Sequence, residues 1–579
     1  MKNKYLISIF LSYFSPKNLS FNIFFIIVPP SEKKVFLREA TGLVREISPI
    51  RAMFFNFCAM SGGIVVLNYI YSAFYPASPI FGLSSLDLAQ ILSAIALIPY
   101  SLIFIALLSR IPRTGGDYVF TSRILSPYLG WLETWTLLFA NMSIIGFELL
   151  QISYVTQGFF ATMSAIFNVN TWNTLSSFFS TPLNQALVGS LLIVFMALLG
   201  FTNTRRFTLF VSIFAILGIS GILLQIIVFS LFVNTSTFLS NFERYTLVAP
   251  SALVNQAFNL STAPLRLEPI TFALLGPAIG FALFNLIGYQ YSAYLAGELK
   301  GNVKRTGYIS ILGSLWLYTT VTWIVLVPLV FLKFGYTFLH AWAYLAFNAP
   351  SSAPLQGVIP HSAILGLIAL PKMWPLWLYV TVVADVLMFS LGPVYIFMMS
   401  RIVFAWAMDR VIPSWFAKVS ERTATPVRIY VLTLLGGLIF FLMSFPPISL
   451  NLSSLAYYSI LLSALTWILP GFNAILMPYK RKELFEAGVF TKRLANLPAL
   501  VWIGLVWLAF ILPIYASAFI QPLISGFFSS PTWQYASSTG VSVVALIVFI
   551  GSVIYFVSKY YNKRRGVDIT LAFKEIPPE

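Results

Sequence analysis

Two apolar stretches of the chain are interrupted by small and polar residues, and such an interruption makes backbone chemistry available. The first contains Ser61-Gly62-Gly63, and the second contains Phe284, Asn285 and Gly288. Amide groups freed at Ser61-Gly62-Gly63, at the positive end of a half-helix, can hold a carboxylate without a buried cation. Carbonyl groups freed around Phe284 and Asn285 can accept hydrogen bonds from an ammonium group. Together the two interruptions predict a binding site for a zwitterion.

The two interruptions occupy corresponding positions, each about a dozen residues after the start of its stretch near Ile50 or Phe272. Paired breaks of this kind are typical of inverted-repeat transporters whose binding site lies near the bilayer midplane. Five helices in each half give the two halves opposite orientations, as inversion requires. The alternative interpretation is that these glycines only allow close packing of membrane helices.

Two carboxylates, Glu148 and Asp385, lie deep within apolar stretches. Burying a carboxylate there is costly, so each is a candidate for carrying a proton or for helping to hold sodium. A structural role with satisfied hydrogen bonds is the alternative for both. Glu133 lies nearer the end of its stretch, and we expect it to pair with a loop arginine at the membrane interface.

The elements that position these residues are membrane-spanning helices. Of the 579 residues, 59% are hydrophobic and only 9% are charged, which leaves too little polar surface for a water-soluble protein of this size. We therefore predict an all-α integral membrane protein with about twelve transmembrane helices, because a span needs roughly 20 apolar residues. The third stretch is long enough to predict a tilted or projecting helix. The twelve stretches are 50–73, 88–109, 129–161, 185–203, 207–233, 272–298, 307–332, 374–400, 427–444, 454–477, 499–519 and 540–558.

The basic residues follow a topological pattern. If the N-terminus is cytoplasmic and the spans alternate, all but four of the 35 Lys and Arg residues lie on the cytoplasmic side. This asymmetry favours a multi-pass protein of the cell membrane with both termini in the cytoplasm, and it explains the net charge of +17 without nucleic acid. The four outside residues are Arg244, Arg266, Lys333 and Lys372.

The predicted organisation is one membrane domain with terminal extensions. Residues 1–49 form a cytoplasmic or interfacial extension, and no role is assigned to residues 1–35. The inverted-repeat transport core covers 50–477, with repeats 50–233 and 272–477; two additional helices cover 499–558, and a cytoplasmic tail covers 559–579.

The remaining candidate ligands for a metal or cofactor give no site. The single cysteine, Cys58, is expected to pack inside the first span, and His340 and His361 are expected to be loop residues without metal-ligand spacing. No metal or cofactor is predicted beyond a coupling ion, H+ or Na+. The two longer outside loops, 234–271 and 333–373, are expected to carry short caps.

Three segments outside the spans resemble motifs of one transporter superfamily. Pro112 to Tyr118 resembles its Pro-x-x-Gly-Gly-x-Tyr stretch, and 400–427 resembles its Ser-Arg, Ala-x-Asp-Gly, Pro and Thr-Pro-Val series, with Arg410 at the final Gly of Ala-x-Asp-Gly. Residues 297–305 resemble its Glu-x-Lys-Asn-Pro-x-Arg tail without the proline. In order and spacing these segments are similar to the amino acid, polyamine and organocation permeases over about 50–480.

The resemblance implies a five-plus-five inverted-repeat core with discontinuous helices one and six, and two added helices. It implies a permease, a symporter or antiporter, that moves a small molecule, most simply an amino acid, by alternating access. It also places Phe284 where the family carries an aromatic lid over the substrate, with Gly288 in the sixth-helix break. Relatives that couple to protons use a lysine in the fifth span or a Glu at the position of Gln290; this chain has neither, so its coupling stays open.

Several other functions are alternatives to amino acid transport. An organic amine, polyamine or nucleobase carrier, or a nutrient sensor that no longer transports, would use the same scaffold. A membrane-embedded enzyme is disfavoured, because the outside loops offer only scattered Glu243, Glu268, His340 and His361 for acid, base or metal chemistry. Substrate identity, direction of transport and oligomeric state are not specified by the sequence.

Replacing Gly62 or Gly63 by Leu tests the first break. A bulky side chain would keep the backbone amides away from a carboxylate, so we expect substrate binding to weaken by at least about tenfold while membrane insertion is retained. Binding by the purified variants is the measurement. Unaltered affinity in both variants contradicts the predicted site.

Overall fold

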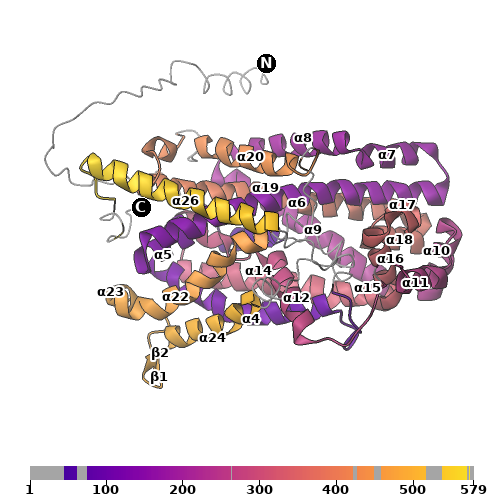
Figure 1. Cartoon of the computed structure of the whole chain (residues 1–579), viewed down its shortest axis with the longest axis horizontal. Coiled ribbons are helices and arrows are strands. Elements are labelled where there is room, and N and C mark those ends of the chain that lie inside the picture. The colour runs from indigo at the N-terminus through magenta and orange to yellow at the C-terminus, as the bar shows by residue number, and fades with distance from the viewer. Residues whose placement is uncertain are drawn as a thin grey trace, which may run out of the picture.

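The computed structural model describes residues 45–60, 75–262, 264–420, 427–446, 448, 458–516, 538–569 and 573. Nearly all regular elements in these ranges are helices, and most long helices run roughly along the long axis of the molecule (Figure 1). One two-residue hairpin, β1 (Arg493–Leu494) with β2 (Leu497–Pro498), is the exception. The all-α prediction is therefore confirmed for the described residues.

Within the described ranges, eight helices are long and apolar enough to cross a membrane. Single helices supply five of them, and three are longer runs that contain or adjoin other elements. The single helices are α4 (Ser85–Arg110), α6 (Pro127–Phe167), α8 (Pro182–Gly200), α9 (Thr204–Phe232) and α26 (Ser538–Arg564). The runs are Val303–Phe334 (α13 Val303–Gly307, η4 Tyr308–Leu312, α14 Gly313–Tyr318, η5 Thr319–Leu326, α15 Val327–Phe334), Pro371–Met408 (η7 Pro371–Met373, α19 Trp374–Met408) and Tyr458–Lys480, which contains α22 (Ala464–Lys480).

The other four predicted stretches contain shorter helices. These are α2 (Pro49–Ala59), α12 (Phe272–Leu286) followed by the 3-10 helix η3 (Tyr291–Glu298), α20 (Val427–Leu442) and α24 (Ala499–Tyr515). Every predicted stretch thus contains helix, but twelve spans and their inverted-repeat relation stay predictions.

Local sequence explains where the longest helices begin and end. A capping box starts α4, because Ser84 and Asp87 each bond the other's backbone N–H. Ser126 caps α6 and Pro127 fills its first position; Asn168, in the left-handed conformation, ends it. The third stretch is therefore one 41-residue helix, about 60 Å long and about twice the thickness of a bilayer core.

Short helices collect at the two ends of the molecule. The loops expected to carry caps contain α10 (Thr235–Thr246), α11 (Pro250–Phe258), α16 (Tyr336–Asn348), η6 (Pro350–Ser352), α17 (Pro354–Gly357) and α18 (Ser362–Ala369), so this prediction is confirmed. Figure 1 shows α10, α11, α16, α17 and α18 together at one end with α7 (Asn170–Ser180) nearby, and α5 (Asp117–Ile124) and α23 (Lys482–Glu486) at the opposite end. The turn η8 (Ser414–Ala417) follows α19.

Buried ion pairs join the helices near the α5 end. Arg401 on α19 binds Glu298, the last residue of η3, through two nitrogen atoms at 2.8 and 2.9 Å, and neither side chain is exposed. Arg123 on α5 binds Asp409 at 2.7 Å. Removing one partner of such a pair leaves an uncompensated buried charge, so these contacts stabilise the packing of η3 and α5 against α19 in this conformation.

Candidate functional site

The sixth predicted span is broken where the sequence placed the interruption. Helix α12 ends at Leu286, and Ile287 then adopts φ −59° and ψ 137°. Gly288 has a φ of +97°, which side-chain-bearing residues rarely adopt, and helical structure resumes only at Tyr291. The discontinuity therefore spans Ile287 to Gln290, two residues later than the interruption from Asn285 to Gly288.

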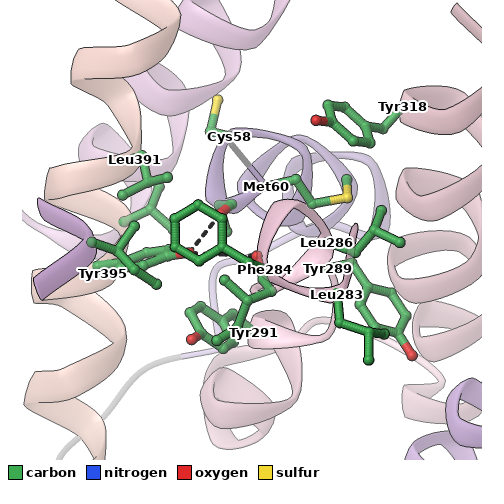
Figure 2. Packing of buried hydrophobic residues seen from close by; sticks show 14 of the residues in the cluster. Cys58, Met60, Leu283, Phe284, Leu286, Tyr289, Tyr291, Tyr318, Leu391 and Tyr395 are labelled. Carbon is green, nitrogen blue, oxygen red and sulfur yellow. Dashed lines mark hydrogen bonds between the residues drawn. The ribbon is translucent and has the colours of Figure 1, made fainter. Parts of the chain in front are cut away.

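The first predicted span ends beside this break. Helix α2 stops at Ala59, and Met60 is extended. A Cβ atom on Gly288 would lie 2.6 Å from the Ala59 Cβ and 2.8 Å from the Ala59 carbonyl oxygen. The two helix ends touch at a point where only glycine fits. Figure 2 shows Met60, Phe284 and Leu286 among the buried hydrophobic residues of this region. Ser61, Gly62 and Gly63 lie outside the described residues.

Tyr395 on α19 bridges the two helix ends, and sequence analysis missed it. Its hydroxyl lies 2.9 Å from the Ala59 carbonyl oxygen and 3.4 Å from the Ile287 carbonyl oxygen, and the side chain is fully buried (Figure 2). It thus donates to carbonyl groups that the end of a helix leaves without an intrahelical partner. A tyrosine in the interior of an otherwise apolar span was the available sequence signal.

Asn56, one turn before the end of α2, ties this helix to η3 and η4 beyond the break. Its amide nitrogen donates to the Ser292 hydroxyl at 3.0 Å and to the Ser310 carbonyl at 2.9 Å, and its oxygen accepts from the Ser292 N–H at 2.7 Å. Because all three contacts are buried, α2 and η3 are joined as a unit.

The sequence predicted free carbonyl groups around Phe284, and the Phe284 carbonyl itself is not free. The Phe284 carbonyl accepts a long bond, 3.3 Å, from the Ile287 N–H. The ring is buried and meets the rings of Phe147 and Phe281 with centroid distances of 5.3 and 5.5 Å. Phe284 therefore lies at the break among aromatic neighbours.

Buried amide side chains with unused hydrogen-bonding groups surround the break. Gln290 is fully buried, and neither its amide nitrogen nor its oxygen has a hydrogen-bond partner among the described residues. The Asn285 amide donates weakly to Gln90 at 3.4 Å, while the Asn285 oxygen and the Gln90 nitrogen have no such partner within the described ranges. Buried polar groups are normally satisfied, so these amides point to a ligand or water at the break.

The two deep carboxylates lie in different surroundings. Glu148 on α6 is buried within electrostatic range of the Tyr395 and Tyr318 hydroxyl groups, and the preceding Phe147 packs against Phe284. Asp385 accepts a hydrogen bond of 2.9 Å from Thr156 on α6. It precedes Tyr395 by ten residues on α19, about 15 Å along the helix. The structure brings Glu148, but not Asp385, to the break.

Glu133 and the histidines are also placed differently from expectation. Glu133 is fully buried, no described arginine pairs with it, and its electrostatic neighbour is Asp117 at the start of α5. The interfacial ion pair expected for Glu133 is therefore wrong, because the rotation of α6 turns this face inward. His340 lies within α16 and His361 directly precedes α18, and both side chains are buried. Burial lowers the pKa of His340 to about 4.

Comparison with known proteins gives one family match. The sequence model of a family described as amino acid permease matches residues 52–522, which run from within α2 to beyond the end of α24. This region contains both helix ends at the break, Tyr395 and both deep carboxylates. Comparison with curated proteins gave no match to the chain.

Gly288→Ala tests the close approach of the two helix ends. We expect a loss of more than about 1–3 kcal/mol in stability, because strain at positive φ adds to the clash with Ala59. Gly82→Ala is the matched control, since Gly82 has a φ of +78° but nothing within 4 Å of the added carbon. Thermal unfolding in detergent measures both variants, and equal losses would mean that the contact with Ala59 is not required.

Proposed function

The chain belongs to the amino acid permease family, and from this premise we propose that it is a secondary active transporter that moves an amino acid across the cell membrane by alternating access. Membership makes it a multi-pass membrane protein of a transporter family with a small-molecule substrate. The proposal adds the substrate, the mechanism and the parts that carry them.

The broken sixth helix carries the proposal. Unwound backbone at Ile287 to Gln290 lies against the end of α2, and the buried amides of Asn285 and Gln290 have unused donors and acceptors within the described part of the chain. Such a site can hold the ammonium group of a zwitterion through carbonyl and amide oxygens. Its carboxylate would bind the amides that follow Met60, at Ser61-Gly62-Gly63.

The mechanism assigns movement to the unit of α2, α12 and η3. Asn56 and the contact of Gly288 with Ala59 hold these helices together, so they can rock as one body against α6 and α19. Tyr395 follows the unit through two hydrogen bonds that are easily exchanged for bonds to substrate or water. Phe284, between Phe147 and Phe281, would act as an aromatic lid on the bound side chain.

Uptake into reconstituted vesicles tests the proposal. We expect saturable uptake of at least one labelled amino acid when a proton or sodium gradient or a counter-substrate is supplied. Amines, polyamines and nucleobases belong in the same panel, and uptake of one of these alone would replace the substrate class. Substrate-induced thermal stabilisation with no flux would indicate a sensor, and no binding and no uptake across the panel would contradict the function.

We further propose that Glu148 couples transport to the ion, because it lies closer to the break than Asp385. Glu148→Gln should abolish accumulation against a gradient while leaving exchange of internal for external substrate. Asp385→Asn is the matched variant, and we expect it to retain accumulation because Asp385 bonds Thr156 away from Tyr395. Loss of accumulation in Asp385→Asn alone would transfer the coupling role to that residue.

A further inference from the structure

Two buried carboxyl groups meet at the end of the molecule that carries α5. Asp117 is the first residue of α5 and Glu133 lies in the second turn of α6, and neither is exposed. Their electrostatic interaction is the main effect on Glu133 after burial. One Asp117 oxygen has no hydrogen-bond partner among the residues that the structure describes, and no described basic side chain pairs with Glu133.

Further polar groups converge on Glu133. The Thr121 side chain faces Glu133, and the Thr121 hydroxyl oxygen accepts a hydrogen bond of 2.8 Å from the Asn473 amide on α22. The buried Asn473 oxygen has no partner within the described ranges.

The arginines described below lie near this end and bind groups other than Asp117 and Glu133. Arg123 binds Asp409, Arg401 binds Glu298, Arg110 donates to the Leu484 and Val489 carbonyl groups, and Arg481 donates to the Arg123 and Phe573 carbonyl groups. The titratable neighbours of the two carboxyl groups are tyrosines, which carry no positive charge. Among the described residues they are Tyr100 on α4, Tyr289 at the break, and Tyr291 and Tyr294 on η3.

Asp117 is attached to the sixth span. The Tyr294 hydroxyl on η3 donates to the Asp117 carboxylate, and the Gly115 N–H donates to the Tyr294 carbonyl at 3.1 Å. A Cβ atom on Gly116 would lie 2.5 Å from the Tyr294 ring, so the Gly115 to Asp117 segment wraps this tyrosine closely. Movement of η3 away from α5 must break the bond between Tyr294 and Asp117.

Two buried like charges that no described basic side chain is seen to pair with favour retention of one proton. Burial raises the pKa of Asp117 to about 7, even though the bond from Tyr294 opposes this shift. The folded protein therefore binds this proton more tightly than the unfolded chain. Its stabilising effect is present at low pH and is lost as pH rises through about 7.

We propose that Asp117 and Glu133 together bind one exchangeable proton, and that proton binding releases Tyr294 and so permits the unit of α2, α12 and η3 to open toward this end. A neutral carboxyl group is a weaker acceptor than a carboxylate, so the bond from Tyr294 loosens when the pair is protonated. Deprotonation restores it and holds this end closed. The conformational part rests on the proposed transport function, whereas binding of the proton does not.

Infrared difference spectroscopy of the purified protein tests the proton site without transport. Between acid and alkaline pH, the wild type should lose one carboxylic acid band that is absent or altered in both Glu133→Gln and Asp117→Asn. Glu486→Gln is the matched control, because Glu486 is 62% exposed at its side chain. If neither variant changes the difference spectrum, the proposal is overturned. It is also overturned if the wild type binds sodium and Glu133→Gln abolishes that binding, because the site would then hold a sodium ion and not a proton.

Substrate exchange in vesicles tests the release of Tyr294. Exchange by the wild type should fall by up to about tenfold per pH unit on the alkaline side of the titration, as expected for one proton. Glu133→Gln should flatten this profile, and Tyr294→Phe should keep exchange high at alkaline pH. A wild-type profile retained in both variants contradicts the release step. Absence of exchange with every substrate, beside an intact infrared titration, would refute the proposed function and leave the proton site standing.

Discussion

Hydrogen bonding of the backbone in a medium without water constrains this structure more than any other interaction. Lipid cannot satisfy a free N–H or C=O group, so a helix may break within the bilayer only where protein covers the break. Here the ends of α2 and α12 meet each other, with Gly288 in contact with Ala59, and the Tyr395 hydroxyl donates to a carbonyl from each side. The break is thus enclosed by protein rather than exposed to lipid.

The same constraint explains why the break is suited to a ligand. Gln290 and Asn285 place amide groups where apolar side chains would pack more stably, and their unused donors and acceptors raise the free energy of the empty site. A polar ligand that satisfies them recovers this free energy. In the transport function that we propose, selectivity for a zwitterion would follow from the geometry of backbone groups and not from a buried counter-charge.

Contacts near the α5 end connect the break to the remainder of the fold. Glu298 holds the end of η3 to Arg401, and Asp117 holds its middle through Tyr294. The first contact is an ion pair between opposite charges, whereas the second depends on a carboxyl group that no basic side chain pairs with among the described residues. The second attachment is therefore the one that we propose to be sensitive to proton binding.

The sequence by itself determined the class of protein, the positions of the helical stretches and the break in the sixth, because hydropathy, glycine content and interruption are local properties of the chain. Two deep carboxylates were also visible for that reason. Only the tertiary structure decided which side chains meet. Glu148 comes within electrostatic range of Tyr395, Asp385 accepts a hydrogen bond from Thr156, and Glu133 comes within electrostatic range of Asp117 instead of pairing with an arginine. Those contacts depend on how each helix is rotated and packed against helices distant in sequence. In spans that are apolar on every face, the hydrophobic periodicity of the sequence is too weak to predict how each helix is rotated about its own axis.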